Sequence, residues 1–226
     1  MKYKRIEEGR FLSRPNRFIA EVMIDGKKEI CHVKNTGRCR ELLIPGVQVY
    51  LEVSDNPKRS TKYDLVAVKK GEMLINVDSM APNKAVFEFL KEGRLFENIM
   101  KIRPETTYGE SRFDFYMETE RDKIFIEVKG VTLENEGVVM FPDAPTQRGV
   151  KHINELVAAS RAGYKTYILF VVQMSECKYF TPNRATHPEF ANALRFAKEN
   201  GVEILAYNCK LTAESMELFE PVEVKL

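Results

Sequence analysis

Short segments in which apolar and polar side chains alternate fill the first third of the chain. The segments are FIAEVMI, EICHV, VQVYLEV, DLVAVKK and MLINV, and between them lie the turn sequences Asp25-Gly26, Asn35-Thr36-Gly37, Pro45-Gly46 and Gly71. Alternation with a period of two predicts half-buried strands, and short strands at regular spacing are typical of a small barrel. We therefore expect residues 1–80 to form an all-β domain, a five-stranded barrel of the OB type.

Helical periodicity begins after residue 80. The segment KAVFEFLKEG places Val86, Phe87 and Leu90 on one face, and further helices are predicted over 147–162 and 188–199. The run YKTYILFVV is apolar almost throughout, as in a strand buried on both faces, and VEILAYN supplies another strand after the last helix. Strand, helix and strand in succession indicate a parallel crossover. Residues 81–226 are therefore predicted to form an α/β domain with a mixed sheet, and the fold class is α/β with an all-β N-terminal domain.

The segment RFDFYMETERDKIFIEVKG, residues 112–130, predicts a hairpin that carries charged residues inside both strands. With a turn over 119–122, Glu118 pairs with Lys123. The same register then places Asp114 opposite Glu127 and Arg112 opposite Lys129, all on one face of the sheet. Directly opposed carboxylates repel each other unless a cation neutralises them.

Two carboxylates with room for water and a phosphate are the ligands that Mg²⁺ or Mn²⁺ prefers. Such an ion activates water, and Lys129 can position that water or stabilise charge on phosphorus. Asp114, Glu127 and Lys129 are therefore the candidate catalytic residues for phosphodiester hydrolysis, with Asp114 and Glu127 as metal ligands. Glu88, on the first predicted helix, is a candidate third ligand, and Glu110 is another. The alternative is an exposed strand whose ion pairs have no catalytic role.

The helix predicted over 147–162 begins with phosphate-binding character. Thr146 is its expected N-cap, and free backbone N–H groups beside Arg148 and Lys151 are suited to a phosphate. Its buried stripe is predicted as Val150, Ile153 and Val157, with Arg148, His152 and Glu155 on the opposite side. His152 is a candidate proton carrier, with a hydrogen-bonded structural histidine as the alternative.

Charge is distributed unevenly, although the whole chain carries a net charge of only +2. Residues 1–80 hold 16 Lys and Arg against 11 Asp and Glu, and this basic excess suggests a polyanion partner such as nucleic acid. A solvated basic face is the alternative. Phe18 and Tyr50 are expected in the core rather than as base-stacking platforms. The candidate nucleic-acid contacts are Arg14, Asn16, Arg17, Lys34, Asn35, Thr36 and Arg38 in the barrel, and Arg112, Arg148 and Lys151 in the second domain.

Composition excludes several other classes of protein. The sequence contains neither a long apolar run nor a secretory signal, so a cytoplasmic protein without membrane association is expected. The four cysteines are scattered, which favours buried thiols over a disulfide framework or a zinc site. The exposed edges of a small barrel are compatible with a homodimer.

Asp114 and the segment Glu127-Val128-Lys129 resemble the PD-(D/E)XK motif of restriction-endonuclease-like nucleases, with Phe113 in the place of the motif's proline. The whole chain resembles the sugar fermentation stimulation protein A family, through the segments RPNRFIAEV, HVKNTGRCRELLIPG, YGESRFDF, IEVKGVTL and FPDAPTQRGVKHINEL. This resemblance implies an OB-like domain joined to a nuclease-like domain, and a DNA-binding role. Three hypotheses follow: a metal-dependent nuclease acting on DNA, a nuclease acting on RNA, and a non-catalytic DNA-binding regulator linked to sugar metabolism.

Overall fold

The computed structural model describes residues 1–35 and 37–226. Thr36, one of the predicted nucleic-acid contacts, lies outside the described residues. In the described part of the chain, no helix is both long and apolar enough to cross a membrane.

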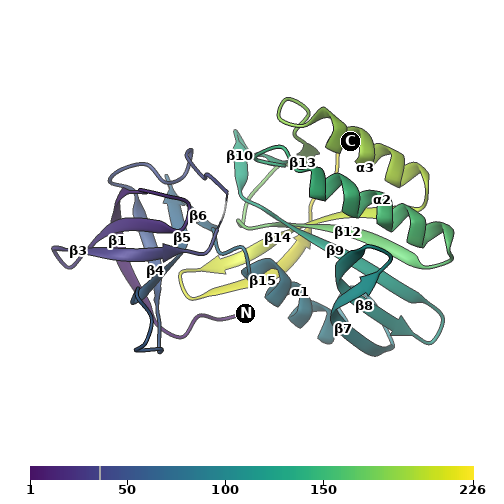
Figure 1. Ribbon diagram of the computed structural model, residues 1–226, viewed down its shortest axis with the longest axis horizontal. Coiled ribbons are helices and arrows are strands. Elements are labelled where there is room, and N and C mark those ends of the chain that lie inside the picture. Colours follow the sequence, from purple (N-terminus) through teal and green to yellow (C-terminus); the bar gives the residue numbers. More distant parts are fainter. Residues whose placement is uncertain (36) are drawn as a thin grey trace.

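The first third of the chain forms the predicted closed barrel (Figure 1). The strand order is β3-β2-β1-β4-β5-β6, and parallel pairing of β3 with β5 closes a ring of five strands. The strands are β1 (Ile6–Ser13), β2 (Ile19–Ile24), β3 (Lys27–Val33), β4 (Gln48–Val53), β5 (Tyr63–Lys70) and β6 (Met73–Asn76). Asp25 and Gly26 have positive φ angles of 48° and 75°, which confirms the tight hairpin between β2 and β3.

One barrel strand was not predicted. Strand β1 buries only Gly9 and Phe11, so its alternation of apolar and polar residues is too weak to recognise. The predicted strand MLINV is β6, which pairs with residues 67–70 of β5, beyond the residues of β5 that pair with β3, and lies outside the ring.

A six-stranded mixed sheet with the order β15-β14-β12-β9-β8-β7 forms the centre of the second half. Its strands are β7 (Ile99–Tyr108), β8 (Ser111–Thr119), β9 (Lys123–Val131), β12 (Lys165–Val172), β14 (Val202–Thr212) and β15 (Ser215–Pro221). The inner strands β9, β12 and β14 run parallel, and the outer pairs are antiparallel, as expected for a mixed sheet. A small sheet contains β10 (Leu133–Asn135), β11 (Val138–Phe141) and β13 (Tyr179–Pro182). Strand β7 was not predicted, because this edge strand is polar and has no fully buried residue.

Helices cover both faces of the large sheet (Figure 1). Ile168 and Phe170 of β12 pack into the cluster that contains α2 (Gln147–Arg161) and α3 (Pro188–Glu199). Leu169 and Val171 pack into the cluster with α1 (Ala81–Lys91) on the other face. This arrangement confirms that β12 is buried on both faces.

The barrel contacts the α/β half through polar groups. The backbone N–H of Asn76 donates to the carbonyl of Gln173 at 2.9 Å, and Lys70 Nζ lies 2.6 Å from a carboxylate oxygen of Glu134. Since Gln173 directly follows β12, the barrel lies beside the end of the central parallel strands. The site described next is at that end of the sheet.

Candidate active site

The hairpin of β8 and β9 has the predicted register over four residue pairs, from Phe115–Ile126 to Glu118–Lys123. The ladder ends there, one position before Asp114 and Glu127. Asp114 Oδ2 instead accepts a hydrogen bond from the backbone N–H of Val128 at 2.7 Å. A side chain therefore replaces a backbone partner where the two strands part.

Arg112 does not lie opposite Lys129, so this part of the predicted register is wrong. The backbone of Arg112 pairs with Thr107 of β7, and its guanidinium lies 3.5 Å from Glu105. The reason is the separation of β8 from β9, which begins at Asp114.

Asp114 is held by two donors. Besides the Val128 N–H, the side-chain amide of Asn83 on α1 donates to Oδ1 at 2.7 Å. Burial raises the pKa of Asp114, and the nearby charge of Glu127 raises it further. A carboxylate that is fixed in place and repelled by a second carboxylate is suited to binding a cation.

Glu127 is almost completely buried, with 2% of its surface exposed. Its Oε1 accepts hydrogen bonds from Lys129 Nζ, at 2.5 Å, and from His152 Nδ1. Burial raises the pKa of Glu127, but the hydrogen bond from His152 and the charge of Lys129 outweigh burial, and the pKa lies below its ordinary value. Glu127 is therefore ionised at neutral pH.

The second carboxylate oxygen of Glu127 has no partner. Oε2 is buried and forms no hydrogen bond with any described residue. A buried oxygen without a partner costs stability, and a divalent cation would supply the missing interaction. Together with the raised pKa of Asp114, this orphan oxygen makes the two carboxylates a candidate site for Mg²⁺ or Mn²⁺.

The protein offers only a small ligand set for such an ion. Among residues 1–35 and 37–226, no group of three or more His, Cys, Asp or Glu side chains is placed to hold a metal. Mg²⁺ is often bound by one or two carboxylates, with water and substrate phosphates as the other ligands. Asp114 and Glu127 fit that pattern.

Glu88 is not a third ligand, and that prediction is wrong. Its carboxylate is 54% exposed and lies 2.5 Å from the amino group of Met1. Glu110, the other candidate, is exposed and pairs with Lys151 at 3.0 Å. Glu88 was proposed for its position on the first helix and Glu110 for its position just ahead of the hairpin, but both side chains bind other partners.

His152 is buried, contrary to the predicted position on the outer face of its helix. Nδ1 contacts Glu127, and Nε2 accepts a hydrogen bond from Arg148 Nε at 3.4 Å. Both ring nitrogens therefore have protein partners. The geometry supports the alternative interpretation, a structural histidine, and its role is to orient the carboxylate of Glu127. Val150, expected on the buried stripe, is only partly buried.

The start of α2 has the predicted cap, because Thr146 Oγ1 accepts from the backbone N–H of Gly149 at 3.0 Å. Arg148 is exposed beside this cap, and Lys151 forms only the exposed ion pair with Glu110. Exposed ion pairs contribute little stability, so a phosphate can displace the carboxylate. Phosphate contact by Arg148, Lys151 and Arg112 stays a prediction.

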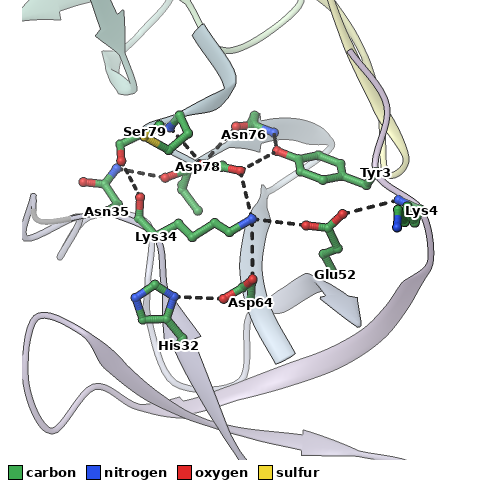
Figure 2. Close-up of polar contacts among 12 residues, drawn as sticks. Tyr3, Lys4, His32, Lys34, Asn35, Glu52, Asp64, Asn76, Asp78 and Ser79 are labelled. Carbon is green, nitrogen blue, oxygen red and sulfur yellow. Dashed lines mark hydrogen bonds and ion pairs between the residues drawn. The ribbon is translucent and has the colours of Figure 1, made fainter. Parts of the chain in front are cut away.

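Lys34 is not available to a phosphate, which corrects its assignment as a nucleic-acid contact. Figure 2 shows its ammonium group between Glu52, at 3.1 Å, and Asp64 and Asp78, both at 3.5 Å. Three carboxylates neutralise the single positive charge. Lys34 therefore joins β4, β5 and the segment before α1.

Three other predicted contacts also serve the fold of the barrel loops. The terminal nitrogens of Arg14 donate to four backbone carbonyls at 2.6–2.8 Å. Asn35 donates to the carbonyl of Val77 and accepts from Gly37, and Asn16 Oδ1 accepts from the backbone of residues 18 and 19. The polar groups of Arg14 and Asn35 are used within the loops, which contradicts their assignment as phosphate contacts, whereas phosphate contact by the exposed Asn16 stays a prediction. Arg17 and Arg38, in contrast, are exposed.

A buried polar network next to the site was missed at the sequence level. Asp78 is fully buried and accepts from Tyr3 and from the backbone of Met80 at the start of α1 (Figure 2). Gln173 donates to Asn76 and to the carbonyl of Asp78 at 3.0–3.2 Å. A polar residue directly after the apolar run 164–172 was the available indication that Gln173 contacts another part of the protein.

The chain is similar over its whole length to sugar fermentation stimulation proteins. Residues 12–77 match the model of the SfsA N-terminal OB domain, and residues 80–215 match that of the sugar fermentation stimulation protein RE domain. The sugar fermentation stimulation protein homolog of Desulfitobacterium hafniense strain Y51 is 59% identical, with 100% of this chain and 99% of the relative covered. The homolog of Ruminiclostridium cellulolyticum is 58% identical, with both chains covered at 100%.

A solved structure has the same fold. Pyrococcus furiosus SfsA, determined in complex with Ca²⁺, superimposes with a TM-score of 0.91 at 30% sequence identity. The match covers 100% of this chain and 98% of that chain. The barrel and the mixed-sheet domain are therefore shared with an experimentally determined relative.

Proposed function

The chain belongs to the sugar fermentation stimulation protein family, and from this premise we propose that it is a nucleic-acid-binding protein with a divalent-metal nuclease site. Asp114 and Glu127 bind the metal, and Lys129 is the catalytic amine. DNA is the proposed substrate. The barrel and the basic residues around α2 bind its phosphates.

The buried Oε2 of Glu127 carries this proposal. A carboxylate oxygen that lies inside the protein without a donor, beside a second carboxylate, is the environment that a divalent cation satisfies. The Pyrococcus furiosus relative was determined with Ca²⁺, an ion that also takes oxygen ligands. That observation supports a divalent cation in this family without assigning its ligands in this chain.

The residues around the carboxylates have distinct roles in the proposed reaction. A bound Mg²⁺ or Mn²⁺ would polarise the phosphate and lower the pKa of a bound water. Asn83 and the Val128 N–H hold Asp114, while His152 and Lys129 occupy Oε1 of Glu127 and leave Oε2 for the ion. Lys129 Nζ, only partly buried, can also donate to a phosphate oxygen or to the attacking water.

The decisive experiment incubates the purified protein with single- and double-stranded DNA and RNA, with Mg²⁺ or Mn²⁺. Cleavage by the wild-type protein, abolished in Asp114→Asn and in Glu127→Gln, is expected. Glu88→Gln is the matched control, because it removes a carboxylate of the same domain that pairs with the amino group of Met1. This control should cleave like the wild-type protein.

The other hypotheses predict different results. Cleavage of RNA alone would identify a nuclease acting on RNA. Tight, salt-sensitive DNA binding with no cleavage under either metal would overturn the nuclease proposal and favour the DNA-binding regulator. Cleavage that survives in both carboxylate variants would place the active site elsewhere.

A further inference from the structure

A pocket on the barrel surface concentrates positive charge. Four arginines, Arg14, Arg17, Arg38 and Arg40, line a hollow of about 280 Å³, which we call the arginine pocket. Among the described residues that line it, none carries a carboxylate. Arg17, Arg38 and Arg40 are exposed and form no ion pair with any described residue. The uncompensated charge makes this surface complementary to a polyanion.

Arg14 gives the arginine pocket a defined shape. Its guanidinium binds the backbone carbonyls of Arg17, Asn35, Gly37 and Arg38, which belong to two loops far apart in sequence. One partly buried side chain thus joins the loop before β2 to the loop after β3. Arg14 therefore holds the backbones of Arg17 and Arg38 close together, so a ligand does not have to bring these two residues together on binding.

An exposed aromatic ring lies next to the arginine pocket. Phe18 is 49% exposed, which shows that the prediction of a core residue is wrong. Its backbone N–H is held by Asn16 at 2.8 Å, and the guanidinium of Arg17 lies 5.4 Å from the ring centroid. A half-exposed ring beside uncompensated arginines is the combination with which proteins bind unpaired nucleotides, because the ring stacks on a base and the arginines contact its phosphates.

A second pocket lies where the barrel meets the α/β half. The interdomain pocket, about 200 Å³ in volume, is lined by Gly37 from the barrel and by Gly130 and Thr132 from the α/β half. Gly37 also lines the arginine pocket, so the two hollows meet at that residue. Gly130 directly follows Lys129. A Cβ atom at position 37 would lie 2.8 Å from Asp143 Oδ2 and 2.9 Å from Asn35 Oδ1, so only glycine fits at this close contact without a shift of its neighbours.

We propose that Phe18 with Arg17, Arg38 and Arg40 forms a binding site for an unpaired segment of nucleic acid, which passes over Gly37 toward Lys129. The proposal specifies the substrate as single-stranded, because bases inside a duplex are already stacked on each other and cannot stack on Phe18. Only the path toward Lys129 rests on the proposed nuclease function. Binding at the arginine pocket stands independently of cleavage.

The test measures binding without cleavage. Fluorescence anisotropy with EDTA present compares a labelled single-stranded DNA, the same sequence as RNA, and the DNA duplex. Phe18→Ala is expected to weaken single-strand binding about tenfold or more and to leave duplex binding unchanged. Phe196→Ala is the matched control, because Phe196 is also exposed, at 45%, and has Arg161 at 5.8 Å from its ring. The control should bind like the wild-type protein.

The arginines give a second, independent readout. Arg38→Gln and Arg40→Gln should each reduce the slope of log affinity against log salt for single-stranded DNA by about 0.7. Thermal unfolding of each variant checks that the fold is unchanged. The relative affinities for DNA and RNA identify which single strand the site prefers.

Specific results would overturn the proposal. These are unchanged single-strand binding in Phe18→Ala, an equal loss for single strand and duplex, or an equal loss in Phe196→Ala. Binding of anionic vesicles but not of single strands would also overturn it. If Glu127→Gln and the wild-type protein bind single strands equally and neither cleaves, the nuclease proposal fails while this site stands. If the wild-type protein and Phe18→Ala cleave single strands equally, the nuclease proposal stands while this site fails.

Discussion

Asp64 is expected to stabilise the folded protein in a pH-dependent way. This carboxylate is 3% exposed and accepts hydrogen bonds from Arg59 at 2.6 and 2.8 Å and from His32 at 2.8 Å. Burial alone would raise the pKa of Asp64, but Arg59, His32 and Lys34 together lower it from 3.8 to about 2. Because the unfolded chain binds the proton at a higher pH, the ionised carboxylate stabilises the fold above the unfolded pKa, and this stabilisation is lost as the pH falls through the folded pKa.

The two pKa values, 3.8 and about 2, correspond to about 2 kcal/mol of folding free energy at neutral pH. About half of this amount, roughly 1 kcal/mol, should be lost when the pH is lowered from 7 to 3. Asp64→Asn keeps the shape of the side chain but cannot ionise. The wild-type protein should therefore exceed this variant in stability by about 2 kcal/mol at pH 7, and the difference should shrink toward pH 3.

Urea unfolding of both proteins at several pH values between 3 and 7 measures this difference. Asp55→Asn is the control, because Asp55 also pairs with a cation, Lys4, but is 67% exposed. Its effect on stability should be much smaller than that of Asp64→Asn. A difference between wild type and Asp64→Asn that stays constant from pH 7 to pH 3 would refute the reasoning.

Three further predictions concern the candidate active site. Mn²⁺ at about one hundred times its dissociation constant should stabilise the wild-type protein by about 2.7 kcal/mol in thermal unfolding. An equal stabilisation of Glu127→Gln would contradict the assignment of Glu127 as a metal ligand. His152→Ala should weaken Mn²⁺ binding about 10- to 100-fold in calorimetric titration, because Glu127 loses the partner that orients it. Lys151→Ala is the control and should not weaken Mn²⁺ binding. Equal Mn²⁺ affinities of His152→Ala and the wild-type protein would refute the orienting role. Gly130→Ala should lower the free energy of unfolding by about 2 kcal/mol, because the added methyl group meets buried Gln173 and lies 3.0 Å from Pro82 Cγ. A urea midpoint equal to that of the wild-type protein would show that Gln173 moves aside without cost.

Patterns local in sequence predicted much of the architecture. The alternation in FIAEVMI and EICHV, with Asp25-Gly26 between them, predicts a hairpin, and the structure contains β2, β3 and a two-residue turn there. The run before Gln173 predicts a strand buried on both faces, and β12 is such a strand. Both succeed because side-chain alternation along one strand is set by the backbone of that strand alone.

The strands that were not predicted are those with the weakest local pattern of apolar and polar residues. Strand β1 has few buried apolar residues, and β7 is a polar edge strand. Strand β1 is held by backbone hydrogen bonds to β4, which is distant in sequence, and β7 is held by backbone hydrogen bonds to β8, the next strand of the chain. Such bonds involve groups that every residue carries, so they leave no mark in the residue types.

The sequence by itself determined which residues carry charge. Through the hairpin register it also determined that Asp114 and Glu127 both lie at the end of the hairpin away from its turn. Only the tertiary structure decided which partners these charges have. Lys34 meets three carboxylates, Arg14 binds four carbonyls, and Glu88 pairs with the amino group of Met1. The reason is physical: a charge interacts over a few ångströms in space, and its neighbours at that distance come from segments that folding brings together from distant parts of the chain.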